Sequence, residues 1–452
     1  MKRTYFLYVL LFTAGLFSCG KEWLDAQSDK ALVVPSSLRD FRELLDNASG
    51  VMNNNYALLG EIGADNYYLR ASTWQAASLT NRNAYVWAKD VFGGRTELSW
   101  NAAYKRVLYC NTVLQGLEDL KSSSAQQAEW KELKGTALFF RAHTFYDLAQ
   151  IYAPVYSEPT AGSALGIPLR LTPSINQRSG RASLKETYER IVNDLTQAAP
   201  LLSTSSVYKT RPTRQAALGL LARVHLSMQD YEKAYAAADS ALQLNPTLLD
   251  YNLLDLIGAN PFLPLNEEMV FYAQLSYSSI LASTSYRVDS TLVRSYAASD
   301  LRRKAFFSRR PDGTHTFIGS YSGALHFGGI ARDELYLIRA ECLARKGQVL
   351  EAMNDLNTLL KNRMERASFV PLSAGSAEEA LRVILTERRK ELLFRGLRWT
   401  DLRRLNQDGR FAVTLKRNLN GTIYELAPND KRYVYPIPDD VIKASGMQQN
   451  ER

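Results

Sequence analysis

Pairs of carboxylates could catalyse hydrolysis of a glycosidic bond, which uses two carboxyl groups about 5 to 10 Å apart. Glu387 and Glu391 are four residues apart, which places them on one face of a predicted helix. Arginines flank both residues, so ion pairing explains this pair better than catalysis. The neighbours Glu267–Glu268 and Asp439–Asp440 have the sequence context of solvated turn residues. None of these pairs predicts a catalytic site.

The four histidines are scattered along the chain. His143 and His225 lie in apolar helical segments, which favours core positions, whereas His315 and His326 lie in an irregular segment where a ligand could reach them. The sequence contains no phosphate-binding glycine loop, dinucleotide-binding motif, HExxH helix, paired CxxC motif or G-x-S-x-G turn. We therefore predict no catalytic residue, no metal site and no cofactor.

The N-terminal segment has the pattern of an export signal. Lys2 and Arg3 precede an apolar run from 5 to 17, which is too short for a membrane-spanning helix of about 20 residues. Ser18 and Cys19 at its end resemble a bacterial lipobox, in which the cysteine is acylated. We predict a lipoprotein signal peptide at 1–18, lipidation of Cys19 and a lipidated tether at 19–37. The alternative is an ordinary secretory signal with an incidental cysteine.

The other cysteines and the overall composition favour a folded, exported protein. Cys110 and Cys342 lie in apolar helical patterns and are expected to be buried thiols. With 452 residues, of which 46% are hydrophobic, the chain can bury a substantial core. The net charge of +9 could suit nucleic acid, but no basic run interleaves with exposed aromatic residues. The densest basic stretch, 381–410, mixes both charges and predicts a solvated helix face with local ion pairs, so we predict no nucleic-acid partner.

Paired helices provide the strongest organisational pattern. A unit of about 34 residues that starts at Gln215 has small or apolar residues at the contact positions of a tetratricopeptide repeat. A second unit starts at Asp333. The contact positions are Leu218, Leu221, Ala222, His225, Ala234, Ala238 and Ala241 in the first unit, and Tyr336, Ala340, Leu343, Ala352, Leu356 and Leu359 in the second.

Two divergent helix pairs complete the predicted scaffold. One joins 97–120 to 126–152, and the other uses 377–396. Between the helical regions, 247–331 has no sustained helical period, contains many glycines and shows the alternation of short strands. We predict a mainly α fold: a tetratricopeptide-like helix-pair scaffold with a long irregular insert. The expected parts are an N-terminal helical part at 38–246, the insert at 247–331 and a C-terminal part at 332–452.

This arrangement, together with several local motifs, resembles the SusD/RagB family of outer-membrane nutrient-binding lipoproteins. The chain departs from the family pattern at Arg395 and Leu397, where an acidic residue and usually a histidine precede Arg398–Trp399. The motifs that carry the resemblance are Leu133 to Ala142, Phe145 to Leu148, Arg211–Pro212–Thr213, Asp333 to Glu341, Glu387 to Leu392, Arg398–Trp399, Asp401 to Arg404 and Tyr435 to Pro438.

The resemblance implies a function in nutrient uptake. Members of the family are lipid-anchored at the outer membrane and face the exterior, where they bind a glycan or a peptide and deliver it to a SusC-like TonB-dependent β-barrel transporter. Such a protein needs affinity and no active site. The alternatives are a surface glycoside hydrolase and a tetratricopeptide-type scaffold for protein–protein interaction.

The resemblance also directs attention to an aromatic, amide-rich stretch between residues 61 and 83. Aromatic rings suit the apolar face of a sugar, and polar side chains suit its hydroxyl groups. Packing in the core is the alternative for each aromatic residue. The expected ligand-binding residues are Asp65, Tyr67, Tyr68, Trp74 and Asn81, with Tyr296 and Tyr321 from the insert.

Overall fold

A computed structural model of the chain describes residues 35–120, 124–258 and 260–452. The predicted signal peptide at 1–18, the lipidation site Cys19 and the tether up to residue 34 lie outside the described residues. Within these described ranges, no helix combines the length and the apolar character that a membrane span requires.

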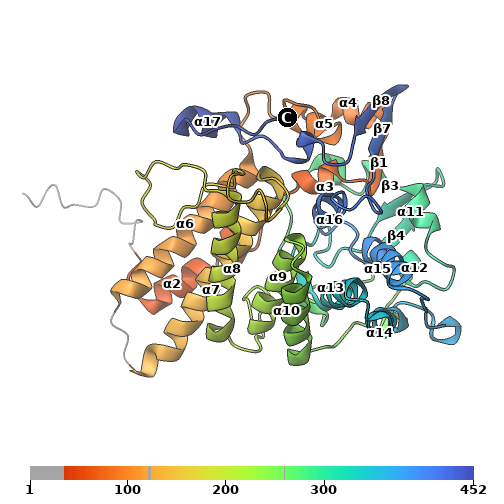
Figure 1. The fold of residues 1–452 in the computed structure, drawn as a ribbon, viewed down its shortest axis with the longest axis horizontal. Helices are drawn as coiled ribbons and strands as arrows, with labels where there is room; N and C mark the ends of the chain where they lie inside the picture. The colour runs from red at the N-terminus through yellow and green to blue at the C-terminus, as the bar shows by residue number, and fades with distance from the viewer. Residues whose placement is uncertain (1–34, 121–123, 259) are drawn as a thin grey trace, which may run out of the picture.

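A row of packed helices forms the scaffold, and each helix of the row contacts the next (Figure 1). The row confirms the predicted mainly α, tetratricopeptide-like fold. Its members in order are α6 (Leu98–Asp119), α7 (Gln127–Tyr152), α8 (Leu184–Leu201), α9 (Arg214–Ser227), α10 (Tyr231–Leu244), α13 (Arg332–Arg345), α14 (Val349–Lys361) and α15 (Ala377–Glu391).

Small residues allow the central helices to approach each other closely, as the repeat pattern predicts. Ala222 of α9, Ala234 and Ala238 of α10 and Cys342 of α13 share one buried cluster. Cys110 and Cys342 are both free and buried, as expected. Helix α15 ends at Glu391, before the predicted 396, because Phe394 and Gly396 have positive φ values of 56° and 73° that no α-helix accommodates.

Helix α8 was not part of the predicted pairs, although its start has a recognisable sequence pattern. The Ser183 hydroxyl accepts a hydrogen bond from the Glu186 backbone N–H, and the Glu186 carboxylate accepts one from the Ser183 backbone N–H. This is the capping box that a Ser-x-x-Glu sequence predicts. The same device starts α2 at Ser37 and Asp40. Helix α8 fills the interval between α7 and α9, and it makes the row continuous.

Shorter elements cover the row. The short helices are α2 (Leu38–Leu45), α3 (Leu59–Gly63), α4 (Ala71–Ala76), α5 (Leu79–Tyr85), α11 (Ser290–Arg294), α12 (Arg302–Phe306), α16 (Arg398–Leu405) and α17 (Asp439–Ser445). Four antiparallel strand pairs are described: β1 (Tyr67–Leu69) with β3 (Tyr286–Val288), β2 (Met269–Phe271) with β6 (Ile330–Ala331), β4 (Phe307–Arg309) with β5 (His315–Phe317), and β7 (Leu415–Leu419) with β8 (Thr422–Leu426).

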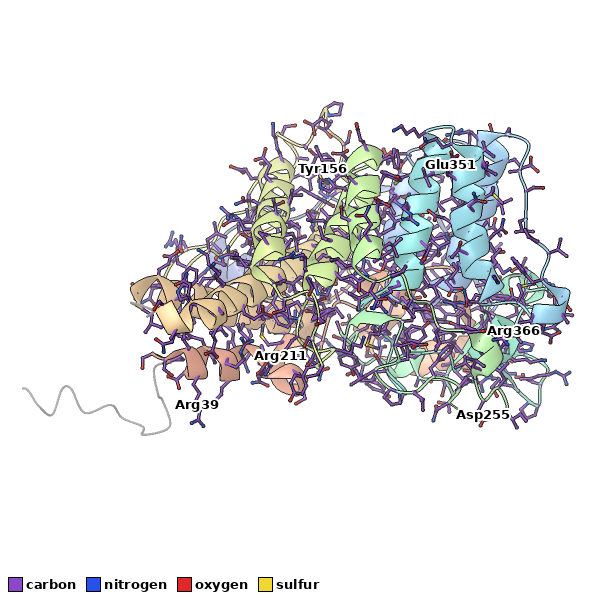
Figure 2. All side chains as sticks on the ribbon, turned by 90° about the horizontal axis from the view of Figure 1, so that it is seen from below. Arg39, Tyr156, Arg211, Asp255, Glu351 and Arg366 are labelled. Carbon is purple, nitrogen blue, oxygen red and sulfur yellow. The ribbon has the colours of Figure 1, made fainter. Side chains whose placement is uncertain are left out.

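The insert and the helix row lie on different sides of the molecule. Figure 2 shows Glu351 of α14 at one side and Asp255 of the insert at the opposite side. The insert packs on the main core through buried aromatic residues such as Phe271, Phe306 and Tyr321. It is therefore a second layer on the scaffold, with short strands as predicted.

Candidate functional site

Segments that are far apart in the sequence meet around β1. Figure 1 shows α4 and α5 beside the β7–β8 hairpin, at the upper right of the view. Strand β3 of the insert pairs with β1 in the register Tyr68↔Arg287. The N-terminal part, the insert and the C-terminal part thus all contribute to this region, which we call the candidate ligand surface. It comprises Tyr68, Arg70, Trp74, Asn81, Arg287, Asp312 and Tyr424.

Two neighbouring tyrosines of strand β1 point to opposite faces of the strand. Tyr67 is 1% exposed and Tyr68 is 36% exposed, because successive side chains of a strand point to opposite faces. The Tyr67 hydroxyl donates to the carbonyl of Ile62 at 2.9 Å, and burial raises its pKa. Of the two predicted residues, Tyr68 therefore lies on the surface and Tyr67 belongs to the core.

Trp74 of α4 forms an aromatic pair with Tyr424 of β8. Their ring centroids are 6.3 Å apart, and Trp74 Nε1 donates to the carbonyl of Arg82 at 3.1 Å. The indole is half-buried, so its orientation is fixed while part of the ring stays accessible. Asn81 in α5 is also half-buried, and its side-chain amide forms no hydrogen bond within the described ranges.

A charged group lies next to Tyr68. Arg70 lies between the end of β1 at Leu69 and the start of α4, and its Nη2 is 2.6 Å from Oδ2 of Asp312. Arg287, opposite Tyr68, lies 3.3 Å from the same carboxylate. Hydrogen bonds from Thr314 and the contact with Arg287 lower the pKa of Asp312, so the carboxylate stays ionised at neutral pH. Charged donors and acceptors thus adjoin an exposed ring.

Asp65, another predicted ligand residue, forms ion pairs with two arginines of the C-terminal part. Arg398 binds it through two hydrogen bonds of 2.7 and 2.9 Å, and Arg389 Nη2 lies 3.2 Å from the same carboxylate. Burial by itself would raise the pKa of Asp65, but the two arginines outweigh burial and hold the pKa below its usual range. Through these contacts, the Asp65 carboxylate connects the start of β1 to α15 and α16.

Tyr296 and Tyr321, the two candidates from the insert, lie in the core and away from any surface. They are 2% and 1% exposed. The Tyr296 hydroxyl donates to the carbonyl of Lys390 at 2.7 Å, and the Tyr321 hydroxyl donates to Glu268 Oε1 at 3.1 Å. Both rings help to bury charged residues, a role that only the packed structure reveals.

Tyr424 was not among the predicted ligand residues, although a local sequence pattern predicts its hairpin. Asn420–Gly421 separates two alternating segments, which is the strongest short-range pattern for a two-residue hairpin. The hairpin is anchored by Arg417, whose guanidinium lies 4.1 Å from the Tyr85 ring and donates to the carbonyl of Tyr67 at 2.6 Å. This anchor places Tyr424 against Trp74.

Two interpretations of charged residues need correction. Glu268, expected in a solvated turn, is fully buried, because Arg363 binds its two carboxylate oxygens at 2.7 and 2.9 Å. The basic stretch 381–410, expected to be a solvated face, instead buries many of its arginines against carboxylates of other elements. The pairs are Arg388–Asp401, Arg395–Asp333 and Arg404–Glu341, at 2.9, 2.7 and 2.6 Å.

Three buried carboxylates cluster together, and each of them is paired with an arginine. Glu268, Asp333 and Glu391 bring their oxygens within 4.8 Å of one another, and all three are buried. Arg363 contacts Glu268 and Glu391, and Arg395 contacts Asp333. Glu387 and Glu391 are ion-paired as predicted, but their shared partner is Arg302 of α12 and not one of the arginines that flank them in the sequence. These carboxylates hold the insert to the scaffold.

The histidines follow their predicted settings only in part. His143 and His225 are buried in α7 and α9, as expected. His326 is buried as well, and its Nε2 lies 3.2 Å from the carbonyl of Leu281, whereas His315 is half-buried in β5. Burial lowers the pKa of His326 to about 4, so this ring is neutral at physiological pH.

Comparison with known proteins is consistent with this architecture. A family model described as "Starch-binding associating with outer membrane" matches residues 22–226, and one described as "SusD family" matches residues 333–452. A SusD-like protein of Bacteroides ovatus is 23% identical over 53% of this chain, and the match spans 42% of that protein's length. SusD-like protein P2 of Formosa agariphila is 24% identical, and the match covers 79% of this chain and 80% of that protein.

Solved structures share the fold. A SusD superfamily protein from Bacteroides thetaiotaomicron superposes with a TM-score of 0.75 at 21% identity, covering 92% of this chain and 100% of that chain. A SusD-like carbohydrate binding protein from Bacteroides vulgatus gives a TM-score of 0.67 at 18% identity, covering 91% of this chain and 97% of that chain. The two family matches, over residues 22–226 and 333–452, show that the chain belongs to the SusD/RagB family.

Proposed function

We propose that this protein is attached to the cell surface by a lipid on Cys19. There it binds a glycan and delivers it to a SusC-like TonB-dependent transporter. The observation that carries the proposal is the candidate ligand surface. The Trp74 backbone N–H donates to the carbonyl of Arg70, so the Trp74–Tyr424 pair lies one helical turn from the Arg70–Asp312 ion pair. Asp312 also contacts Arg287, the cross-strand neighbour of Tyr68. The family description, which names starch binding and the outer membrane, supports the same conclusion. Capture by affinity requires no catalytic group.

The chemistry of the surface suits a sugar. Fixed aromatic rings offer apolar faces at a low cost in conformational entropy, and sugars present apolar C–H faces of matching size. The Asn81 amide and the exposed ion pair supply donors and acceptors for hydroxyl groups at the ring edges. A peptide remains the alternative ligand, since the same groups also bind backbone amides.

Calorimetry on the protein without residues 1–19 tests ligand binding, with panels of neutral and acidic oligosaccharides and of peptides. We expect Trp74→Ala and Tyr68→Ala each to weaken oligosaccharide binding by about tenfold, since a buried aromatic contact contributes about 1 to 2 kcal/mol. Tyr208→Ala is the matched control, because Tyr208 is 56% exposed in the loop between α8 and α9. Equal losses in all three variants would remove this surface from the proposal.

Two further measurements address activity and delivery. Incubation with polysaccharides is expected to release no product, and catalytic turnover would favour the hydrolase alternative. Affinity purification of the full-length lipoprotein from outer membranes is expected to recover a large β-barrel protein. Glycan binding without such a barrel would leave capture supported and delivery unsupported.

A further inference from the structure

A cavity of about 500 Å³ lies between α11, α15, α16 and the segment 411–413 that leads into β7. Helix α15 lines it with Arg382, Leu385, Thr386, Arg389 and Lys390, whose spacing places them on one face of the helix. Helix α16 adds Arg398 at its first residue. The volume is in the range of small-molecule sites and is sufficient for one sugar residue.

The lining of this cavity is basic. Arg382, Arg389, Lys390 and Arg398 contribute to it, and no carboxylate is among the lining residues. The other lining groups are apolar side chains and the hydroxyl-bearing residues Thr291, Ser295 and Thr386. We call this cavity the basic pocket. Its composition favours a ligand that combines negative charge with hydroxyl groups.

The carboxylates that neutralise these cations do not line the pocket. Asp65 forms ion pairs with both Arg389 and Arg398, while Asp289 and Asp401 give smaller electrostatic compensation to Arg389 and Arg398, respectively. Lys390 is held by Glu387 and Asp300, at 2.8 and 3.3 Å. Burial, together with repulsion from Arg398, lowers the pKa of Arg389 against the opposing effects of Asp65 and Asp289.

Donors remain available at the pocket. Arg398 uses Nε and Nη2 for Asp65, and Arg389 uses Nε and Nη2 for Asn66 and Asp65. Within residues 35–120, 124–258 and 260–452, Nη1 of neither arginine donates to a protein acceptor. Arg382 likewise uses only Nε and Nη2, both for the exposed Glu378 on its own helix. A guanidinium with a free N–H edge is well suited to an oxyanion.

We propose that the basic pocket binds an oxyanion, the carboxylate or sulfate of an acidic sugar, through Arg382, Arg389 and Arg398. The inference rests on the proposed function in taking the carrier to be a sugar, and it adds a charged site beside the aromatic one. The two are structurally linked: Asp65 precedes β1 by two residues, and Val413 precedes β7 by two residues.

Saturation-transfer NMR with galacturonate, galactose 6-sulfate and galactose tests the proposal on the protein without residues 1–19. We expect both anionic sugars to bind at least tenfold more tightly than galactose, and their affinity to fall as salt is raised from 50 to 500 mM. Binding of only one of them would identify the anion as carboxylate or sulfate. Equal affinity for all three sugars would overturn the proposal.

Matched substitutions locate the site. Arg382→Gln is expected to weaken binding of the anionic sugars about three- to tenfold, whereas Arg39→Gln is expected to leave it unchanged. Arg382 and Arg39 each form an exposed i,i+4 ion pair, but Arg39 lies on α2 at the far end of the molecule from α15 (Figures 1 and 2). Thr386→Glu places a carboxylate at the pocket and is expected to abolish the preference for anions, while Thr386→Gln retains it.

The outcomes separate this inference from the proposed function. If neutral oligosaccharides bind and the Thr386 variants behave alike toward anionic sugars, the basic pocket is not a site and glycan capture stands. If anionic sugars bind as predicted but no oligosaccharide binds more tightly than a monosaccharide, the pocket stands and glycan capture fails. Folding of the Thr386 variants is checked by their thermal unfolding, since Thr386 is an exposed helical residue.

Discussion

Arginine has two roles in this protein, and burial distinguishes them. Arg302 and Arg363 are fully buried, and each contacts at least two carboxylates. Removing one partner of such a group leaves an uncompensated buried charge, at a cost of about 3 to 5 kcal/mol. Arg382 and Arg70 are exposed, and their ion pairs contribute little to folding. We therefore expect Arg70 and Arg382, which border the two proposed binding sites, to affect ligand binding, and the buried Arg302 and Arg363 to affect stability.

Glu61 provides a test of buried charge through pH. It is 1% exposed, and its carboxylate accepts hydrogen bonds from the Gly396 backbone at 3.0 Å and from Asn66 at 3.3 Å. Burial raises its pKa from 4.5 to about 7. Because the folded state holds the proton more tightly than the unfolded state, this contribution to stability is complete below pH 4.5 and is lost as pH rises through 7.

Glu61→Gln is therefore expected to keep a neutral side chain at every pH. Relative to the wild type, we expect it to gain up to about 3 kcal/mol in the free energy of unfolding between pH 4.5 and 8. Urea unfolding of both proteins at these two pH values measures the difference. Glu43→Gln on α2, an exposed position, serves as the control. A difference that does not change with pH would contradict the assigned pKa.

At the scale of elements, the β7–β8 hairpin is the part that completes the candidate ligand surface. Its two-residue turn has φ values of 54° at Asn420 and 85° at Gly421, and such turns match the twist of the strands they join. The register Arg417↔Tyr424 places both side chains on the inner side of the hairpin, facing the aromatic residues near β1. The position of Tyr424 therefore depends on the turn.

Gly421→Ala tests this dependence. An added Cβ at Gly421 meets no atom within 4 Å, so the cost comes from the positive φ alone, about 1 to 2 kcal/mol. We expect faster hydrogen exchange in the hairpin and weaker oligosaccharide binding. Gly162→Ala is the matched control, because its Cβ also meets no atom and its φ is not in the left-handed region. If both variants behave alike, the turn does not set the position of Tyr424.

At the scale of the whole molecule, buried ion pairs join the helix row to the insert. Arg223 of α9 binds Glu334 of α13 through contacts of 2.8 and 2.6 Å, and its Nη2 also donates to the carbonyl of Gly329 at 2.6 Å. One side chain thus connects two scaffold helices to the end of the insert. Such a contact fixes the layers that form the candidate ligand surface.

Arg223→Leu is expected to lower the free energy of unfolding by about 3 to 5 kcal/mol, because Glu334 would remain buried without a partner. The double variant Arg223→Leu with Glu334→Leu removes both charges and is expected to recover much of this loss. Denaturant unfolding of the wild type and the two variants measures both effects. A double variant as unstable as the single one would show that the ion pair itself, and not the unpaired acid, determines stability.

The helix row was predictable from local patterns. Ala222, Ala234 and Ala238 recur at helical spacing, and all three pack where the repeat pattern places them. The start of helix α8 could also have been predicted, since Ser183 and Glu186 form a capping box that sequence alone can identify. Periodicity and capping act over a few residues, which is why they can be read without a structure.

The candidate site was predictable only in part. Tyr68, Trp74 and Asn81 lie on the surface that the family resemblance indicated, whereas Tyr67, Tyr296 and Tyr321 are buried. Alternation along β1 predicts that Tyr67 and Tyr68 face opposite sides, but not which side is covered. That depends on Arg417 and the hairpin, about 350 residues later in the chain.

Local sequence patterns were enough to predict the helix pairs, their small contact residues, the irregular insert and the resemblance to the SusD/RagB family, because these depend on neighbours within one or two helical turns. Which charges are buried and which aromatic rings are exposed became clear only from the packing of the folded chain. Asp65 meets Arg398, and Glu268 meets Arg363, across long stretches of chain. Ion pairing and burial depend on such distant partners, and no local pattern in either partner specifies the other.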